Sequence, residues 1–151
     1  MSAEAEYWLN ENLKQNFALP EDARDWLLSL WNAIQVFDDM ADGDFPERDK
    51  LDAAICDTLV NMPANVFFQR HRDVLLPLLS VAILKWHASD EAERAKEPNA
   101  TSFVWRAGYY DIVLAVVQIV HGDEVARGVA RTVMNLYGES LSDYMKEMGN
   151  A

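Results

Sequence analysis

The residues best suited to chemistry are aspartates at the end of an apolar segment, 27–44, which reads LLSLWNAIQVFDDMADGD. On a helix with about 100° per residue, Asp38 and Asp42 fall within about 20° of the direction of Trp31, and Asp39 lies about 80° away. We therefore expect the core-facing stripe of this helix to turn acidic toward its C-terminus. Buried carboxylates must be protonated, paired with cations or bound to metal.

A second acidic stripe follows in AILKWHASDEAERAKE, residues 82–97, where Glu93 shares the helix face of Trp86. The next helical segment begins nearby and carries Arg106 and Tyr110 on one face. Because a short turn joins the two segments, we expect Arg106 to lie near Glu93. This arrangement predicts an arginine–carboxylate pair beside a polar pocket.

Oxygen ligands from facing helices suit hard cations, so one hypothesis is a Mg²⁺ or Mn²⁺ site. Its candidate ligands are Asp38, Asp39, Asp42 and Glu93, and Arg106 with Tyr110 would hold a phosphate or carboxylate group. The chemistry would be metal-dependent hydrolysis or binding of a nucleotide or another phosphate ester.

Residues 38–42, DDMAD, resemble the DDxxD motif with which isoprenoid-diphosphate enzymes hold Mg²⁺. A weaker second set, Asn135, Glu139 and Asp143, keeps the four-residue steps of the second metal motif of terpene cyclases. There, however, Glu139 replaces a hydroxyl residue and Gly138 interrupts the helix. The chain is also about half as long as that fold needs, so the resemblance implies no prenyl chemistry.

Two other interpretations of the aspartates remain open. In the first, Asp38 and Asp42 are salt-bridged to an arginine, for which Arg70, Arg72 and Arg106 are the candidates. In the second, residues 38–49 form a calcium loop, although Met40 then occupies a ligand position. Elsewhere, the single cysteine, Cys56, falls on an apolar helix face and is expected to be a buried small hydrophobe.

Composition limits the function classes. The 151 residues are 50% hydrophobic and 25% charged, as in a globular domain, and their formal net charge is −12. Such a charge disfavours direct binding to nucleic acid and to anionic membranes. The first residues lack the basic and apolar regions of a secretory signal, and the apolar runs are too short for a transmembrane helix. We therefore expect a cytoplasmic protein.

The periodicity predicts an all-α fold, because apolar residues recur every three to four positions and no stretch alternates as a strand does. Short connections favour antiparallel neighbours, so we expect one compact bundle of five to seven helices that forms a single domain over residues 1–151. The expected helical segments are 3–16, 21–42, 48–61, 65–71, 73–96, 101–120, 124–137 and 139–148.

Three segments together resemble a family of small helical proteins encoded by tailed bacteriophages or prophages. These are residues 34–44, then residues 67–86 with FFQRH at their start, then Trp105 and Arg106 with Tyr110, followed by the tail at 142–144. The resemblance extends over most of the chain. It implies production in the cytosol of a bacterial host, and it transfers no catalytic residue.

Two functions from different classes follow. The first is an acidic accessory protein that binds another protein, and the second is the metal-dependent phosphate chemistry described above. A virion component is a third alternative, although the chain has no fibrous repeat or coiled-coil heptad. Exposed aromatic residues would also be compatible with a homo-oligomer.

Overall fold

The computed structural model describes residues 3–149, and this part of the chain contains helices and no strand, which confirms the all-α prediction. The chain folds as two compact units, Met1–Arg72 and Asp73–Ala151. The single bundle stays a prediction.

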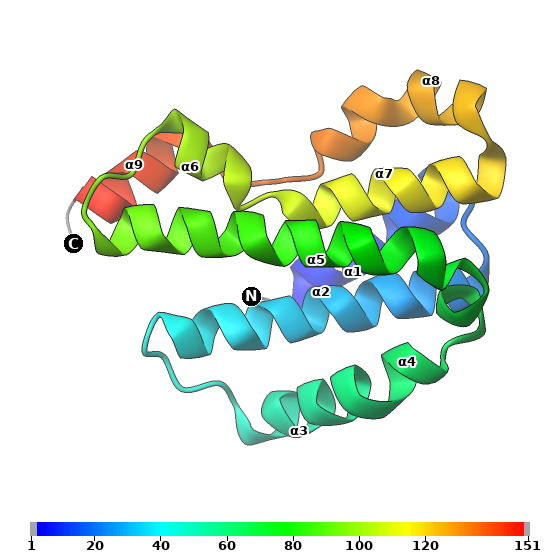
Figure 1. The fold of residues 1–151 in the computed structure, drawn as a ribbon, viewed down its shortest axis with the longest axis horizontal. Coiled ribbons are helices and arrows are strands. Elements are labelled where there is room, and N and C mark those ends of the chain that lie inside the picture. Colours follow the sequence, from blue (N-terminus) through cyan, green and yellow to red (C-terminus); the bar gives the residue numbers. More distant parts are fainter. Residues whose placement is uncertain (1–2, 150–151) are drawn as a thin grey trace. The chain divides into compact units, whose positions relative to one another are not determined.

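The first unit is organised around the long helix α2 (Glu21–Ala41), which begins directly after Pro20 with two acidic residues in its first turn. After α2 the chain reverses direction and forms α3 (Arg48–Cys56), the π-helical η2 (Asp57–Asn61) and the short α4 (Met62–Ala64). Helices α3 and α4 therefore run antiparallel to α2 (Figure 1). The unit starts with α1 (Ala3–Glu11) and the π-helical η1 (Asn12–Asn16).

Helix α2 ends in a Schellman motif formed by the backbone of the acidic segment. The amide of Gly43 donates to the carbonyl of Met40 at 3.2 Å, and the amide of Asp44 donates to the carbonyl of Asp39 at 2.9 Å. Gly43 has φ +84°, a conformation that side chains with a Cβ rarely adopt. The run MADGD therefore forms a helix stop, close to the predicted end at residue 42.

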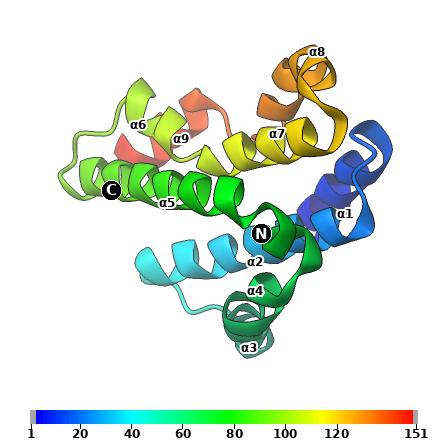
Figure 2. The same ribbon diagram turned by 45° about the vertical axis from the view of Figure 1, so that its right-hand side comes forward.

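Helix α5 (Val66–Arg94) carries the chain from the first unit into the second and has a kink at His71, where φ is −117° and ψ is 19°. The second unit continues with α6 (Ala100–Trp105), α7 (Gly108–His121), α8 (Asp123–Met134) and α9 (Leu141–Gly149). Figures 1 and 2 show α7 and α8 side by side and antiparallel, and α9 beside α6.

Helices α5 and α7 approach closely at one position. A Cβ atom built on Gly108 would lie 3.1 Å from the Cβ of Ala82, closer than most such contacts in proteins. The missing side chain at Gly108 thus lets the two helix backbones pack against each other, and it fixes where α7 begins relative to α5.

Two predicted helix boundaries are wrong. The expected helix over 101–120 is two helices, because the chain leaves helical hydrogen bonding at Arg106 and Ala107. The expected helix over 124–137 ends at Met134, three residues early. In both places the apolar periodicity continues across the break, so the pattern did not reveal it.

In the described part of the chain, no helix combines the length and the apolar character that crossing a membrane requires.

Candidate functional site

The predicted acidic stripe of α2 is less buried than its helical position indicated. Trp31 is buried, but Asp38 and Asp39 are only partly buried and Asp42 is exposed. Val36 is the last buried residue of the helix. The apolar neighbours of the aspartates, Phe37 and Met40, are themselves about half exposed, so the last turn lies outside the core. The expectation of burial is therefore wrong for Asp42, which is exposed, whereas Asp38 is partly buried.

The predicted pairing of Arg106 with Glu93 is present. Arg106 Nε lies 3.8 Å from Glu93 Oε1, and Arg106 Nη1 lies 3.2 Å from Glu139 Oε2. The side chains are mostly buried, with exposed fractions of 16% for Arg106 and Glu93 and 25% for Glu139. One guanidinium therefore joins α5 to the segment that connects α8 to α9.

Aromatic rings enclose this ion cluster. The guanidinium lies over the ring of Tyr144, 5.0 Å from its centroid, and the hydroxyl of Tyr137 donates to Glu139 Oε2 at 2.8 Å. Tyr137 stacks on both Phe103 and Tyr110, with centroids 5.3 and 5.7 Å apart. Burial and the hydrogen bond to the Glu139 carboxylate raise the pKa of Tyr137 far above its ordinary value, so it stays a neutral donor.

Two buried serines connect the cluster to the start of α6. Asn99 caps this helix with Ser102 in a capping box, and the hydroxyl of Ser102 also lies 2.8 Å from that of Tyr144. The Ser89 hydroxyl donates to the carbonyl of Ser102 at 2.9 Å, and its oxygen also lies 3.3 Å from Glu93 Oε2. The hydroxyl groups of Ser89, Ser102 and Tyr144 thus all have hydrogen-bond partners, as in a network that holds helices together.

The other predicted site residues lie outside this cluster or at its edge. Tyr110 contributes a ring, whereas Asn135 and Asp143 are both exposed. Asn135 is the C-cap residue of α8, and the backbone amide of Asp143 donates a hydrogen bond to the hydroxyl oxygen of Ser140. Of the second acidic set, only Glu139 therefore joins the predicted pair. The helix has already ended at Met134, so Gly138 lies in the connection between α8 and α9 and is not what interrupts the helix.

Residues 3–149 contain no group of three or more His, Cys, Asp or Glu side chains placed to hold a metal ion. Glu93, a predicted metal ligand, pairs with Arg106. Arg106, which was predicted to hold a phosphate group, pairs with the carboxylates of Glu93 and Glu139. Binding of Mg²⁺ or Mn²⁺ stays a prediction.

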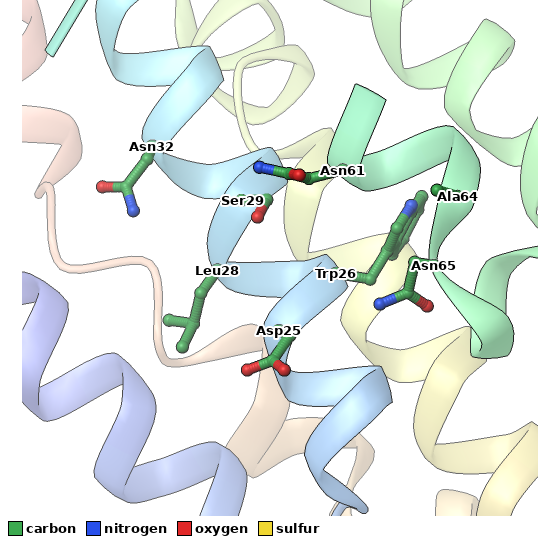
Figure 3. Close-up of a pocket in the computed structure, with 8 residues that line it drawn as sticks. All are labelled: Asp25, Trp26, Leu28, Ser29, Asn32, Asn61, Ala64 and Asn65. Atoms are coloured by element: carbon green, nitrogen blue, oxygen red, sulfur yellow. The ribbon is translucent and has the colours of Figure 1, made fainter. Parts of the chain in front are cut away.

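The first unit contains a polar pocket that the sequence did not indicate (Figure 3). Its volume is about 450 Å³, and it opens between α2 and the end of η2 with α4. The lining comes from two stretches of the chain that lie about 30 residues apart: Asp25, Trp26, Leu28, Ser29, Asn32, Asn61, Ala64 and Asn65.

Hydrogen bonds orient the amides of this pocket. Asn61 Nδ2 donates to Asp57 Oδ1 at 2.9 Å, and Asn32 Nδ2 reaches Glu6 Oε1 at 3.4 Å. Their amide hydrogens are thus directed at carboxylates, which leaves the two carbonyl oxygens as acceptors. Asn65 has a structural role, because it donates to the Asp22 carbonyl at 2.9 Å and accepts from a backbone amide.

Asp25 is the one ionisable group among the residues that line the pocket. It is exposed, yet partial desolvation, and then the nearby carboxylate of Glu21, raise its pKa above the ordinary value, while Arg24 opposes the shift. Its charged form is therefore disfavoured by the fold. A carboxylate kept in such a place is a candidate for binding rather than for stability.

We expect Asp25→Asn to stabilise the chain slightly at neutral pH, by up to about 0.5 kcal/mol. A raised pKa means that the folded chain holds the proton more tightly than the unfolded chain, so ionisation of Asp25 lowers stability as the pH rises. The gain should vanish when the pH falls below the pKa of Asp25. Urea unfolding of both proteins at neutral and acidic pH measures it, and a loss of stability at neutral pH would contradict it.

Cys56 is exposed, so the prediction of a buried residue is wrong. It lies on the outer face of α3 and η2 with Ile55, Leu59 and Val60, which are all about half exposed or more. The apolar face on which it falls does not face the core. Sequence periodicity cannot distinguish an apolar face that packs internally from one that faces solvent.

A larger group of exposed apolar side chains lies on α5 within the second unit. We call it the α5 face, and it consists of Val74, Leu76, Val81, Ile83 and Leu84, with exposed fractions from 48% to 64%. The opposite side of the helix includes Leu75 and Ser89, which are buried, and Ala82, which meets Gly108. Helix α5 is therefore apolar on both sides.

The chain matches no family model, and comparisons with curated proteins and with solved structures find no similar protein either. The phage family named above stays a predicted resemblance.

Proposed function

We propose that this chain is an acidic accessory protein that acts by binding another protein, and that the α5 face is its main contact. The observation that carries the proposal is this face: five large apolar side chains, each about half exposed or more, within 11 residues of one helix. Soluble domains rarely leave such a group in contact with water unless it binds something. An origin in a tailed phage or prophage belongs to the same proposal.

The partner is a different protein with basic groups around an apolar surface. The formal charge of −12 makes two copies of the chain repel each other, whereas a basic partner is attracted. The ion cluster around Arg106 supports the same function in another way. It joins α5 to the segment between α8 and α9, and so stabilises the side of α5 opposite the α5 face.

Photo-cross-linking in the cells that produce the protein tests this proposal. Benzoylphenylalanine at position 84, on the α5 face, should yield one discrete adduct with a second protein. The same group at position 127 is the matched control, because Arg127 is exposed but lies on a different helix, α8. We expect at least about fivefold less adduct there.

Two results would contradict the proposal. The first is the lack of any adduct at position 84 and also at position 81. The second is an adduct of twice the mass of the chain, which would show that the face binds a second copy. A variant with Leu84→Asp should keep its fold, because the side chain is 64% exposed, and should lose the adduct formed through position 81.

A further inference from the structure

The α2–α4 pocket of the first unit displays acceptors and attracts cations. Asp25, Ser29, Asn32 and Asn61 bring oxygen atoms to it from two elements, and none of the described residues that line it is basic. Two more carboxylates, those of Glu6 and Asp57, accept hydrogen bonds from the side-chain amides of Asn32 and Asn61. An occupant of this pocket must therefore be rich in hydrogen-bond donors.

The charge of the unit favours the same kind of occupant. Residues 1–72 carry 14 acidic and six basic side chains, a formal −8, whereas residues 73–151 carry 11 acidic and seven basic ones, a formal −4. The pocket thus lies in the more acidic unit, and a cationic group is drawn toward it before contact.

Trp26 also lines the pocket. Its side chain is 1% exposed, and its indole Nε1, which donates to no described residue, has almost no accessible surface, so an occupant does not bond to it. The indole instead reports on an occupant through a change in its surroundings.

We propose that the α2–α4 pocket binds an arginine of the partner protein. The guanidinium donates to the Asp25 carboxylate and to the oxygens of Asn32 and Asn61. Arginine fits better than lysine because its planar fork has five donors that can reach acceptors spread over two elements, whereas an ammonium group is a point charge. A volume of about 450 Å³ leaves room for the side chain and its main chain. The inference rests on the proposed function, and it names the chemistry that the partner must present.

Nuclear magnetic resonance of the full-length, ¹⁵N-labelled chain tests the inference. The probe is acetyl-Gly-Arg-Gly-amide, and its comparison peptide carries citrulline, which has the same shape but no charge. We expect the arginine peptide to shift the indole signal of Trp26 and the side-chain amide signals of Asn32 and Asn61 at millimolar concentration. The citrulline peptide should bind about tenfold more weakly.

Asp25→Asn should lower the affinity for the arginine peptide about tenfold or more, because the charged acceptor is lost. The matched control is Asp44→Asn, which removes the same charge from an exposed position in the loop after α2 and should change the affinity less than about twofold. Circular dichroism verifies that both variants fold. If Asp25→Asn fails to fold, the comparison of the two peptides on the unaltered chain decides.

Equal binding of the arginine and citrulline peptides would overturn the inference. Unchanged binding by Asp25→Asn would overturn it too, as would shifts confined to residues away from the pocket. These failures differ from failure of the proposed function. If the chain cross-links to a second protein through position 84 but does not bind the arginine peptide, the proposed function stands and only the inference about the pocket is refuted.

Discussion

Replacing Arg106 by leucine is expected to destabilise the second unit by about 3–5 kcal/mol, which corresponds to a fall in Tm of about 10 °C. The guanidinium pairs with two carboxylates, those of Glu93 and Glu139, and all three side chains are at least three-quarters buried. Without it, two negative charges face each other with little water around them. Thermal and urea unfolding measure the loss.

The cause of this loss can be separated from simple loss of packing. Arg106→Lys keeps a charge but not the planar fork, and we expect it to cost about 1–2 kcal/mol. The triple variant Glu93→Gln, Arg106→Met, Glu139→Gln removes all the charges and should recover most of the stability. If it is no more stable than Arg106→Leu, repulsion between the carboxylates is not the reason.

Arg94→Ala is the matched control on the same helix. Arg94 pairs with Asp90 at 2.8 Å, but its side chain is 71% exposed. Exposed pairs contribute little, so this change should cost less than about 0.5 kcal/mol. Equal effects at Arg94 and Arg106 would contradict the structural role of the cluster.

The Arg106–Glu93 pair shows what the sequence can predict. Helix periodicity placed both residues on faces that meet across one short connection, and this local reasoning held even though the helix that carries Arg106 ends there. The third member, Glu139, lies 33 residues from Arg106 and belongs to a segment outside any helix. A pairing across such a distance depends on the path of the chain, which periodicity does not describe.

The acidic stripe shows the limit of the same method. A helical projection gives the direction of Asp38 and Asp42 but not where the packing partner of α2 ends. Val36 is the last fully buried residue of α2, so Asp38 is only partly buried and Asp42 is exposed, although both point in the core direction. The α2–α4 pocket was missed for a related reason, because Asp25 and Asn61 each look like ordinary surface residues until the fold brings them together.

Replacing Tyr144 by alanine is expected to cost about 3–5 kcal/mol and to release α9 from the second unit. The side chain is fully buried, its ring lies under the guanidinium of Arg106 and beside Phe103, and its hydroxyl meets Ser102 at 2.8 Å. Amide hydrogen exchange should accelerate over residues 141–149 well before the rest of the unit unfolds.

Two variants separate the contributions of Tyr144. Tyr144→Phe keeps the ring and leaves Ser102 without the phenol, and we expect it to cost about 1–2 kcal/mol. Met145→Ala alters the next residue of α9, which is exposed, and should change stability by less than about 0.5 kcal/mol.

The ring of Tyr144 and the guanidinium of Arg106 are also expected to act together. The loss in the double variant Tyr144→Ala, Arg106→Leu should be smaller than the sum of the two single losses, because each change already breaks the contact between them. Strict additivity would show that α9 and the ion cluster are independent. In that case α9 would not help to fix the position of α5. Only the ion pairs of Arg106 with Glu93 and Glu139 would then stabilise the helix that carries the α5 face.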